Sequence, residues 1–288
     1  MKESLKILIA YDGSECADAA LADLRRAGLP ASLEAVVLTV ADVILPPPDS
    51  EVPEDELLIH IPEGIRHAQA HAAQAVKEAR ALAERAAARV KADFPGWEVK
   101  VEAGGDSPAW AVIKMADQLK PDLIVVGSHG HSIVGGRLIL GSVSQRVLYE
   151  ARYSVRVARC RDAGRDGPVR IVIGFNASPD AQRAMDAVAE RAWPERSEAR
   201  IVTALETATP PSLDVPVDTL RAAGLTVSNV IREGNPSHVL LEEAKEWGAD
   251  SIFVGTRDLH GFKHFLTGSV SSAVAARATC SVEVIRQA

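Results

Sequence analysis

The chain contains one unit twice, and this repeat constrains the fold more than any other feature of the sequence. Three pairs of segments carry the repeat: 6–14 with 170–178, 122–127 with 250–255, and 154–159 with 281–286. Similarity between such long units predicts two homologous domains and excludes an array of short repeats. A length of 288 residues allows each domain its own hydrophobic core.

The predicted boundaries place the first domain at residues 1–160, a polar, glycine-bearing linker at 161–168, and the second domain at 169–288. The second copy is shorter, mainly between its second and third strands. There the first copy has a long alanine-rich segment, which predicts a helix that covers the sheet. The second copy has only a short helical segment near residues 217–223.

In the first copy, short apolar runs alternate with segments of helical periodicity. The predicted strands are 5–11, 35–40, 98–102, 122–127 and 154–158, and the predicted helices are 15–27, 64–92, 108–119 and 142–151. This alternation predicts an α/β fold with a parallel sheet and helices on both faces. Ser14, Ser107-Pro108 and Asn235-Pro236 have the residue types that begin helices.

Composition narrows the functional classes. A net charge of −7 argues against a broad surface for nucleic acid. The apolar run at 7–10 is too short for a signal peptide or a membrane span. The three cysteines are odd in number and far apart, which fits neither a disulfide framework nor a metal site. We therefore expect a cytoplasmic protein with no membrane or nucleic-acid partner.

A glycine-rich segment follows the fourth predicted strand. Gly127 and Gly130 open it, and Gly141-Ser142 close it just before a predicted helix. Glycines allow the backbone to approach a ligand closely, and the first N–H groups of a helix bind anions. Ligands of open parallel sheets bind beyond the carboxyl ends of the strands. The segment therefore predicts a phosphate site, near Asp12 after the first strand and Val40 at the end of the second.

These residues suit different parts of a nucleotide. The carboxylate of Asp12 can accept hydrogen bonds from ribose hydroxyls or an exocyclic amine, and Val40 can form an apolar wall for a base. The glycines and the hydroxyls of Ser142 and Ser144 can hold phosphate oxygens at the helix N-terminus.

With these motifs, nearly the whole chain resembles a tandem member of the universal stress protein family, whose pattern is a strand ending in Asp and then Gly-x2-Gly-x9-Gly-Ser/Thr. The resemblance implies two flavodoxin-like (adenine nucleotide α-hydrolase-like) domains, each with a parallel five-stranded sheet. It also implies ATP binding, with Mg²⁺ or Mn²⁺ bridging the phosphates, and dimerisation through the last strands. The residues that match the family site are Asp12, Gly127, Gly130, Gly141, Ser142 and Ser144, with His129 and Val143 nearby through backbone contacts.

Both copies depart from the family pattern. In the first, ten residues instead of nine separate Gly130 from Gly141, and the pair at 135–136 could absorb the extra residue. In the second, Gly255, Gly268 and Ser269 remain, but Asp258 replaces the second glycine and Asn176 replaces the strand-one aspartate. A carboxylate beside phosphate is repulsive by about 1 to 4 kcal/mol. We therefore expect the nucleotide in the first domain.

Other residues have two readings each. The segment from Asp12 to Ser14 could be only a turn and a helix cap. Glu63, His67 and His71 have a spacing compatible with a metal, as have His260 and His264, but an exposed helix or loop surface is the favoured interpretation. Cys16 is expected to be a small, partly buried residue.

The sequence contains no Walker-type lysine and no Gly-x-Ser-x-Gly elbow, although Arg137 could reach a γ-phosphate. We therefore predict a non-enzymatic, ATP-binding stress-response regulator with an unidentified protein partner. The alternatives are a nucleotide-free interaction module and a slow ATP-hydrolysing enzyme. Segments 154–159 and 281–286 are the predicted edges through which the two domains pair as a pseudo-dimer, and a further homodimer is left open.

Overall fold

A computed structural model describes residues 4–43, 63–130, 140–159, 167–205, 217–256 and 269–287. The strands of the first half are β1 (Lys6–Ala10), β2 (Glu34–Ala41), β3 (Glu98–Gly105), β4 (Leu123–Gly127) and β5 (Ser154–Ala158). Its helices are α1 (Glu15–Asp23), α2 (Glu63–Asp93), α3 (Pro108–Leu119) and α4 (Ser142–Glu150), with a 3₁₀ turn at Leu24–Arg26. The predicted alternation of strands and helices is confirmed.

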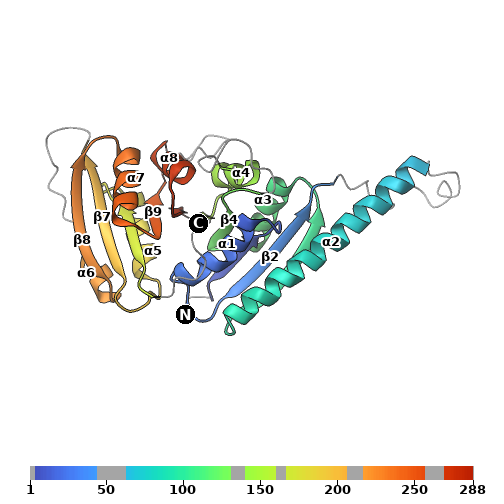
Figure 1. Ribbon diagram of the computed structural model, residues 1–288, viewed down its shortest axis with the longest axis horizontal. Coiled ribbons are helices and arrows are strands. Elements are labelled where there is room, and N and C mark those ends of the chain that lie inside the picture. Colours follow the sequence, from blue (N-terminus) through green and yellow to red (C-terminus); the bar gives the residue numbers. More distant parts are fainter. Residues whose placement is uncertain are drawn as a thin grey trace.

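The second half repeats this order with shorter connections (Figure 1). Its strands are β6 (Arg170–Gly174), β7 (Glu198–Leu205), β8 (Thr226–Glu233), β9 (Ser251–Gly255) and β10 (Ser281–Ile285). Its helices are α5 (Pro179–Ala189), α6 (Val217–Ala222), α7 (Pro236–Trp247) and α8 (Ser269–Arg277). Residues 161–166 of the predicted linker lie outside the described residues, so the domain boundaries stay a prediction.

The strands of both halves form one sheet in the order β3-β2-β1-β4-β5-β10-β9-β6-β7-β8. Each described pairing within a half is parallel, whereas β5 and β10 pair antiparallel, with Glu283 opposite Arg156. The predicted pairing of segments 154–159 and 281–286 is confirmed. The fold class is confirmed as well: two doubly wound halves each contribute five parallel strands, and their last strands join them.

One hydrophobic core extends across both halves on one face of the sheet. It contains alternate strand residues, Val155 and Val157 of β5 and Val282 and Val284 of β10 among them, together with buried residues of α3, α4, α7 and α8. The opposite face has two separate cores, one under α1 and α2 and one under α5 and α6. Because β5 and β10 contribute to the shared core, the two halves are stabilised together.

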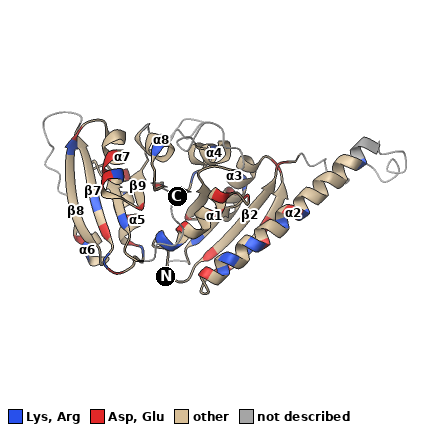
Figure 2. Cartoon of the chain, in the orientation of Figure 1, with Lys and Arg blue, Asp and Glu red and all other residues tan. Residues whose placement is uncertain are grey.

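Helix α2 is 31 residues long and covers the face of β2 and β3, as the sequence predicts (Figure 1). Ala83 and Ala86 pack into the core below it, and its exposed surface carries charges of both signs (Figure 2). In the second half α6 spans only six residues. No helix in the described part of the chain is long and apolar enough to cross a membrane.

Most of the predicted element boundaries agree with the structure, and the differences are local. Ser14 and Asn235 cap α1 and α7 with their side chains, whereas Ser107 occupies the N-cap of α3 without such a bond. Strand β3 continues past the predicted end at residue 102 to Gly105, which pairs with Ala41. The parallel ladder with β2 therefore outweighs the weak strand preference of two glycines.

A buried ionic cluster lies where the halves join. Arg156 donates through Nε to Asp23 at 2.7 Å and through Nη1 to Glu283 at 3.2 Å, and Arg191 also pairs with Glu283. The side chains of Arg156 and Glu283 are fully buried. Burial acts to lower the pKa of the Arg156 guanidinium, but the Asp23 and Glu283 carboxylates outweigh it and raise that pKa. Burial lowers the pKa of Arg191. No motif in the sequence indicates this cluster.

Candidate functional site

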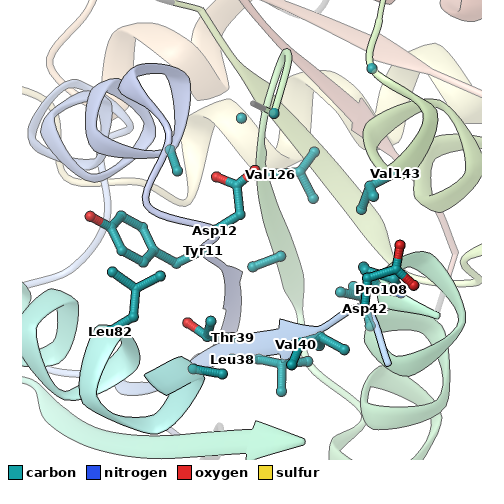
Figure 3. A pocket seen from close by; sticks show the side chains of 18 of the residues that line it. Tyr11, Asp12, Leu38, Thr39, Val40, Asp42, Leu82, Pro108, Val126 and Val143 are labelled. Carbon is teal, nitrogen blue, oxygen red and sulfur yellow. The ribbon is translucent and has the colours of Figure 1, made fainter. Parts of the chain in front are cut away.

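A cavity of about 660 Å³ opens at the carboxyl ends of β1, β2 and β4. The chain runs from β1 toward β3 on one side and from β4 toward β5 on the other, so this is the point where the strand order reverses. The nine residues predicted from the sequence all line this cavity: Asp12, Val40, Gly127, His129, Gly130, Gly141, Ser142, Val143 and Ser144. Figure 3 shows Asp12 and Val40 on opposite sides of it, with Val143 on a third.

Asp12 has a structural role and also faces the cavity. Its Oδ1 accepts a hydrogen bond from the Ser14 amide at 3.0 Å, and Ser14 caps α1 by accepting from the Ala17 amide at 3.2 Å. Its Oδ2 lies against Gly130, where a Cβ would come within 2.7 Å of it. Asp12 and Ser14 therefore form a turn and a helix cap, and Oδ2 of Asp12 lies beside the glycine segment.

The end of β4 and the start of α4 are held together by hydrogen bonds. The Gly141 amide donates to Ser128 O at 2.9 Å, and Ser144 Oγ donates to Gly127 O at 2.6 Å. Gly141 is the N-cap of α4 and has no side chain that could accept from the first-turn amides. Those N–H groups need an acceptor from elsewhere, and an anion in the cavity would provide one. We call residues 127–130 and 141–144 the cradle.

Close approach of the backbone explains two cradle glycines. A Cβ on Gly127 would lie 2.9 Å from the carbonyl oxygen of Cys16, and one on Gly141 would lie 3.3 Å from the Cα of His129. Cys16 itself is half-buried, as expected, with its sulfur 3.8 Å from Ser128 Oγ. The glycines therefore allow β4, α1 and α4 to meet at one point.

One wall of the cavity was not predicted from the sequence. Five residues of α2 line it: Ala75, Glu78, Ala79, Leu82 and Arg85. Leu82 lies beside the turn at Gly13, which has a φ of +77° and where a Cβ would come within 3.1 Å of Leu82. The apolar spacing 75, 79, 82 could have indicated a buried helix face, although not that the face borders a cavity. Asp42 and Pro108 also line the cavity (Figure 3).

Tyr11 joins three elements beside the cavity. Its hydroxyl donates to Asp18 Oδ1 of α1 at 2.8 Å, and Arg89 of α2 donates to the same oxygen at 2.9 Å. Burial, followed by the hydrogen bond and charge of Asp18, raises the pKa of Tyr11 from the ordinary 10.0 to about 12. The bridge holds α2 against the site.

This pKa predicts an alkaline loss of stability. The folded protein holds the Tyr11 proton more tightly than the unfolded chain, so the stabilisation is complete below pH 10 and is lost as the pH rises from 10 to about 12. Tyr11→Phe should remove this part of the pH dependence, which melting temperatures measured across that range would show. If the melting temperature falls equally steeply with pH in the variant and in the original protein, Tyr11 is not the source of the alkaline loss of stability.

The remaining candidates divide into exposed residues and residues outside the described chain. His67 and His71 are exposed on α2, as the favoured interpretation expects, and the described residues contain no group of three or more His, Cys, Asp or Glu that could hold a metal. Several predicted features lie outside the described residues: the glycine pair at 135–136, Arg137, Asp258, His260, His264 and Gly268. Of the candidates of the second half, Gly255 ends β9 and Ser269 begins α8.

Comparisons with known proteins agree with the repeat and the fold. The model of the universal stress protein family matches residues 4–159 and 216–286. A universal stress protein of Mycolicibacterium smegmatis is 28% identical over 97% of this chain and 96% of its own length. One of Mycobacterium tuberculosis is 27% identical over 99% and 97%. The crystal structure of a universal stress protein from Archaeoglobus fulgidus superposes with a TM-score of 0.67 at 21% identity, covering 99% of this chain and all of that one. The chain therefore belongs to the universal stress protein family.

Proposed function

We propose that the first half binds an adenine nucleotide, ATP in the first instance, and that the protein is a stress-response regulator. The observation that carries this proposal is the convergence of nine residues from separate segments on one cavity of about 660 Å³. This volume lies within the range usual for small-molecule sites. Fold alone would not support the proposal, because α/β folds host many functions.

Each part of the nucleotide has a group that suits it. The base would lie against Val40, whose apolar side chain borders the cavity. The ribose would lie beside Asp12, where a carboxylate can accept from hydroxyls. The phosphates would lie in the cradle, where the first amides of α4 and the hydroxyl of Ser142 donate to anions.

A Mg²⁺ or Mn²⁺ ion would accompany the phosphates. Because no group of three or more potential ligands occurs among the described residues, phosphate oxygens and water would supply most of its coordination. We infer that the metal binds with the nucleotide and not before it.

The proposed role is regulatory and not catalytic. Asp12, whose carboxylate lies beside the cradle, accepts a hydrogen bond at Oδ1 from the Ser14 amide, and this bond fixes the orientation of its side chain. We therefore give Asp12 a role in positioning the nucleotide and not in catalysis. The second half, with Asn176 in place of the aspartate, would act through its pairing with the first. We place the domains at residues 1–160 and 169–288 and the protein in the cytoplasm.

The test is the nucleotide itself. Mass spectrometry of material released from freshly purified, denatured protein should find an adenine nucleotide. ATP with Mg²⁺ at a hundred times its Kd should stabilise the fold by about 2.7 kcal/mol, because it binds only the folded state. Absence of both nucleotide and a shift in melting temperature would favour the nucleotide-free module. Sustained ATP turnover that Gly130→Asp abolishes would favour the enzyme.

A further inference from the structure

Helix α4 connects the cradle to the second half of the chain. Its first residues, Ser142 and Ser144, line the cavity. At its other end, Arg286 of the second half donates from Nη2 to Leu148 O and from Nη1 to Ala151 O. The last carbonyl groups of a helix lack partners within the helix and carry partial negative charge, so a guanidinium is a well-matched ligand for them.

Arg286 is itself fixed by the pairing of the two halves. It follows β10 directly, its backbone amide donates to Ser154 Oγ at 3.1 Å, and the residue is only 6% exposed. The antiparallel register places Val284 opposite Val155 and so brings Arg286 to the start of β5. The end of α4 is therefore held by a residue whose position depends on the β5–β10 junction.

A displacement at one end of α4 reaches the other. The helix has nine residues and is about 13 Å long at 1.5 Å per residue. Val147 and Leu148 anchor it fully buried in the core that both halves share. At its start, the Ser144–Gly127 hydrogen bond fixes it to the end of β4. Such a short, buried helix moves as one body, so its C-terminal contact also sets where its N-terminal amides point.

A corresponding contact runs in the opposite direction, from an arginine of the first half to a helix of the second. Arg159, which follows β5, donates from Nη2 to Ala275 O and to Ala276 O, the latter at 3.1 Å, at the C-terminal end of α8. It is also 6% exposed. Arg159 and Arg286 thus have the same exposure, and each donates to carbonyl groups at the end of a helix of the other half. The helix that Arg286 contacts is α4, which begins at the cradle.

The geometry points to Arg286 as a positioning residue for the phosphate cradle, through which the second half sets the nucleotide affinity of the first. This inference rests on the proposed function. Arg286 touches no ligand; it fixes the helix whose first amides would bind the phosphates. By reciprocity, a nucleotide in the first half would tighten the α4–Arg286 contact and the junction of the two halves.

Arg286→Met tests this in the full chain, because methionine keeps the apolar stem and removes both donors. ATP affinity, measured by calorimetry with Mg²⁺ present, should fall about tenfold, within the range usual for coupling between sites. Adenosine affinity should stay unchanged, because adenosine has no phosphate. Arg159→Met is the matched control: it should loosen α8 and leave ATP affinity within about twofold of the original. Arg286→Lys keeps the positive charge but replaces the planar guanidinium with a single ammonium group, so it should give an intermediate loss of ATP affinity.

Two results would overturn the inference: an equal effect of the Arg159 and Arg286 variants on ATP affinity, or an adenosine affinity that falls together with that of ATP. A general loss of stability would produce either of them.

Hydrogen exchange without nucleotide separates this inference from the proposed function. Amides of residues 142–150 should exchange faster in Arg286→Met, or in Arg286→Lys if the methionine variant does not fold, and not in Arg159→Met. If the original protein binds no ATP but α4 still loosens, the proposed function fails while the contact of Arg286 with α4 stands. Unchanged exchange in α4 would refute the positioning role whatever the protein binds.

Discussion

Glu283→Gln is expected to lower the free energy of unfolding by about 3 to 5 kcal/mol, the usual cost of removing one partner from a buried ion pair. Glu283 is fully buried and accepts from both Arg156 and Arg191. Arg156 keeps Asp23, whereas Arg191 keeps just the carbonyl oxygen of Ala27 as a hydrogen-bond acceptor among the residues that the structure describes. The largest cost is therefore the charge left at Arg191. Chemical denaturation followed by circular dichroism would measure it.

Glu198→Gln is the matched control, since it makes the same chemical change in an exposed pair. Arg170 and Glu198 are 49% and 39% exposed at their side chains, and such pairs contribute less than about 1 kcal/mol. Equal losses of stability in the two variants would show that the buried cluster contributes no more than a surface ion pair.

The cluster also predicts non-additivity. In Arg156→Met/Glu283→Met, two apolar side chains replace charges that face each other in the register of β5 and β10. The double variant should therefore lose less stability than the sum of the two single variants, by about 0.5 to 3 kcal/mol. An additive result would mean that the two residues act independently, despite the hydrogen bond of 3.2 Å between them.

The elements and their pairing could be predicted because the signal is local and occurs twice. Apolar runs such as 123–126 specify buried parallel strands, and the repeat identifies 154–159 and 281–286 as equivalent edges. The ionic cluster could not be predicted in this way. Asp23 ends α1 and Arg191 lies just after α5, and only the tertiary fold brings them to the β5–β10 junction.

The candidate site likewise contains residues that local motifs predict and residues that only the tertiary fold reveals. Asp12, Gly127 and Gly141 lie in motifs whose spacing indicates a ligand at the carboxyl ends of strands, and the structure brings them to one cavity. The wall formed by α2 was missed because alanine and leucine at helical spacing indicate burial and do not tell a core from a cavity. Arg286 was missed as a contact of α4, since 138 residues separate it from Leu148 in the chain.

Gly130→Asp is expected to reduce ATP affinity by about fivefold to a thousandfold, because a second carboxylate beside the phosphates costs about 1 to 4 kcal/mol. Steric crowding adds to this electrostatic cost. A Cβ at Gly130 already lies 2.7 Å from Asp12 Oδ2, so the new side chain must displace that carboxylate. The second half of the chain has aspartate at the corresponding position, 258. Calorimetric titration with Mg²⁺-ATP measures the loss.

Gly130→Asn separates the two causes, because asparagine has the size of aspartate without its charge. Its loss of affinity should reflect crowding of Asp12 alone, and the further loss in the aspartate variant should shrink as salt screens the charges. Asn229→Asp adds the same charge at an exposed position of β8, away from the cavity, and should preserve both fold and binding. If folded Gly130→Asp binds ATP as the original protein does, the phosphates do not lie at the end of β4, and the cavity holds its ligand elsewhere.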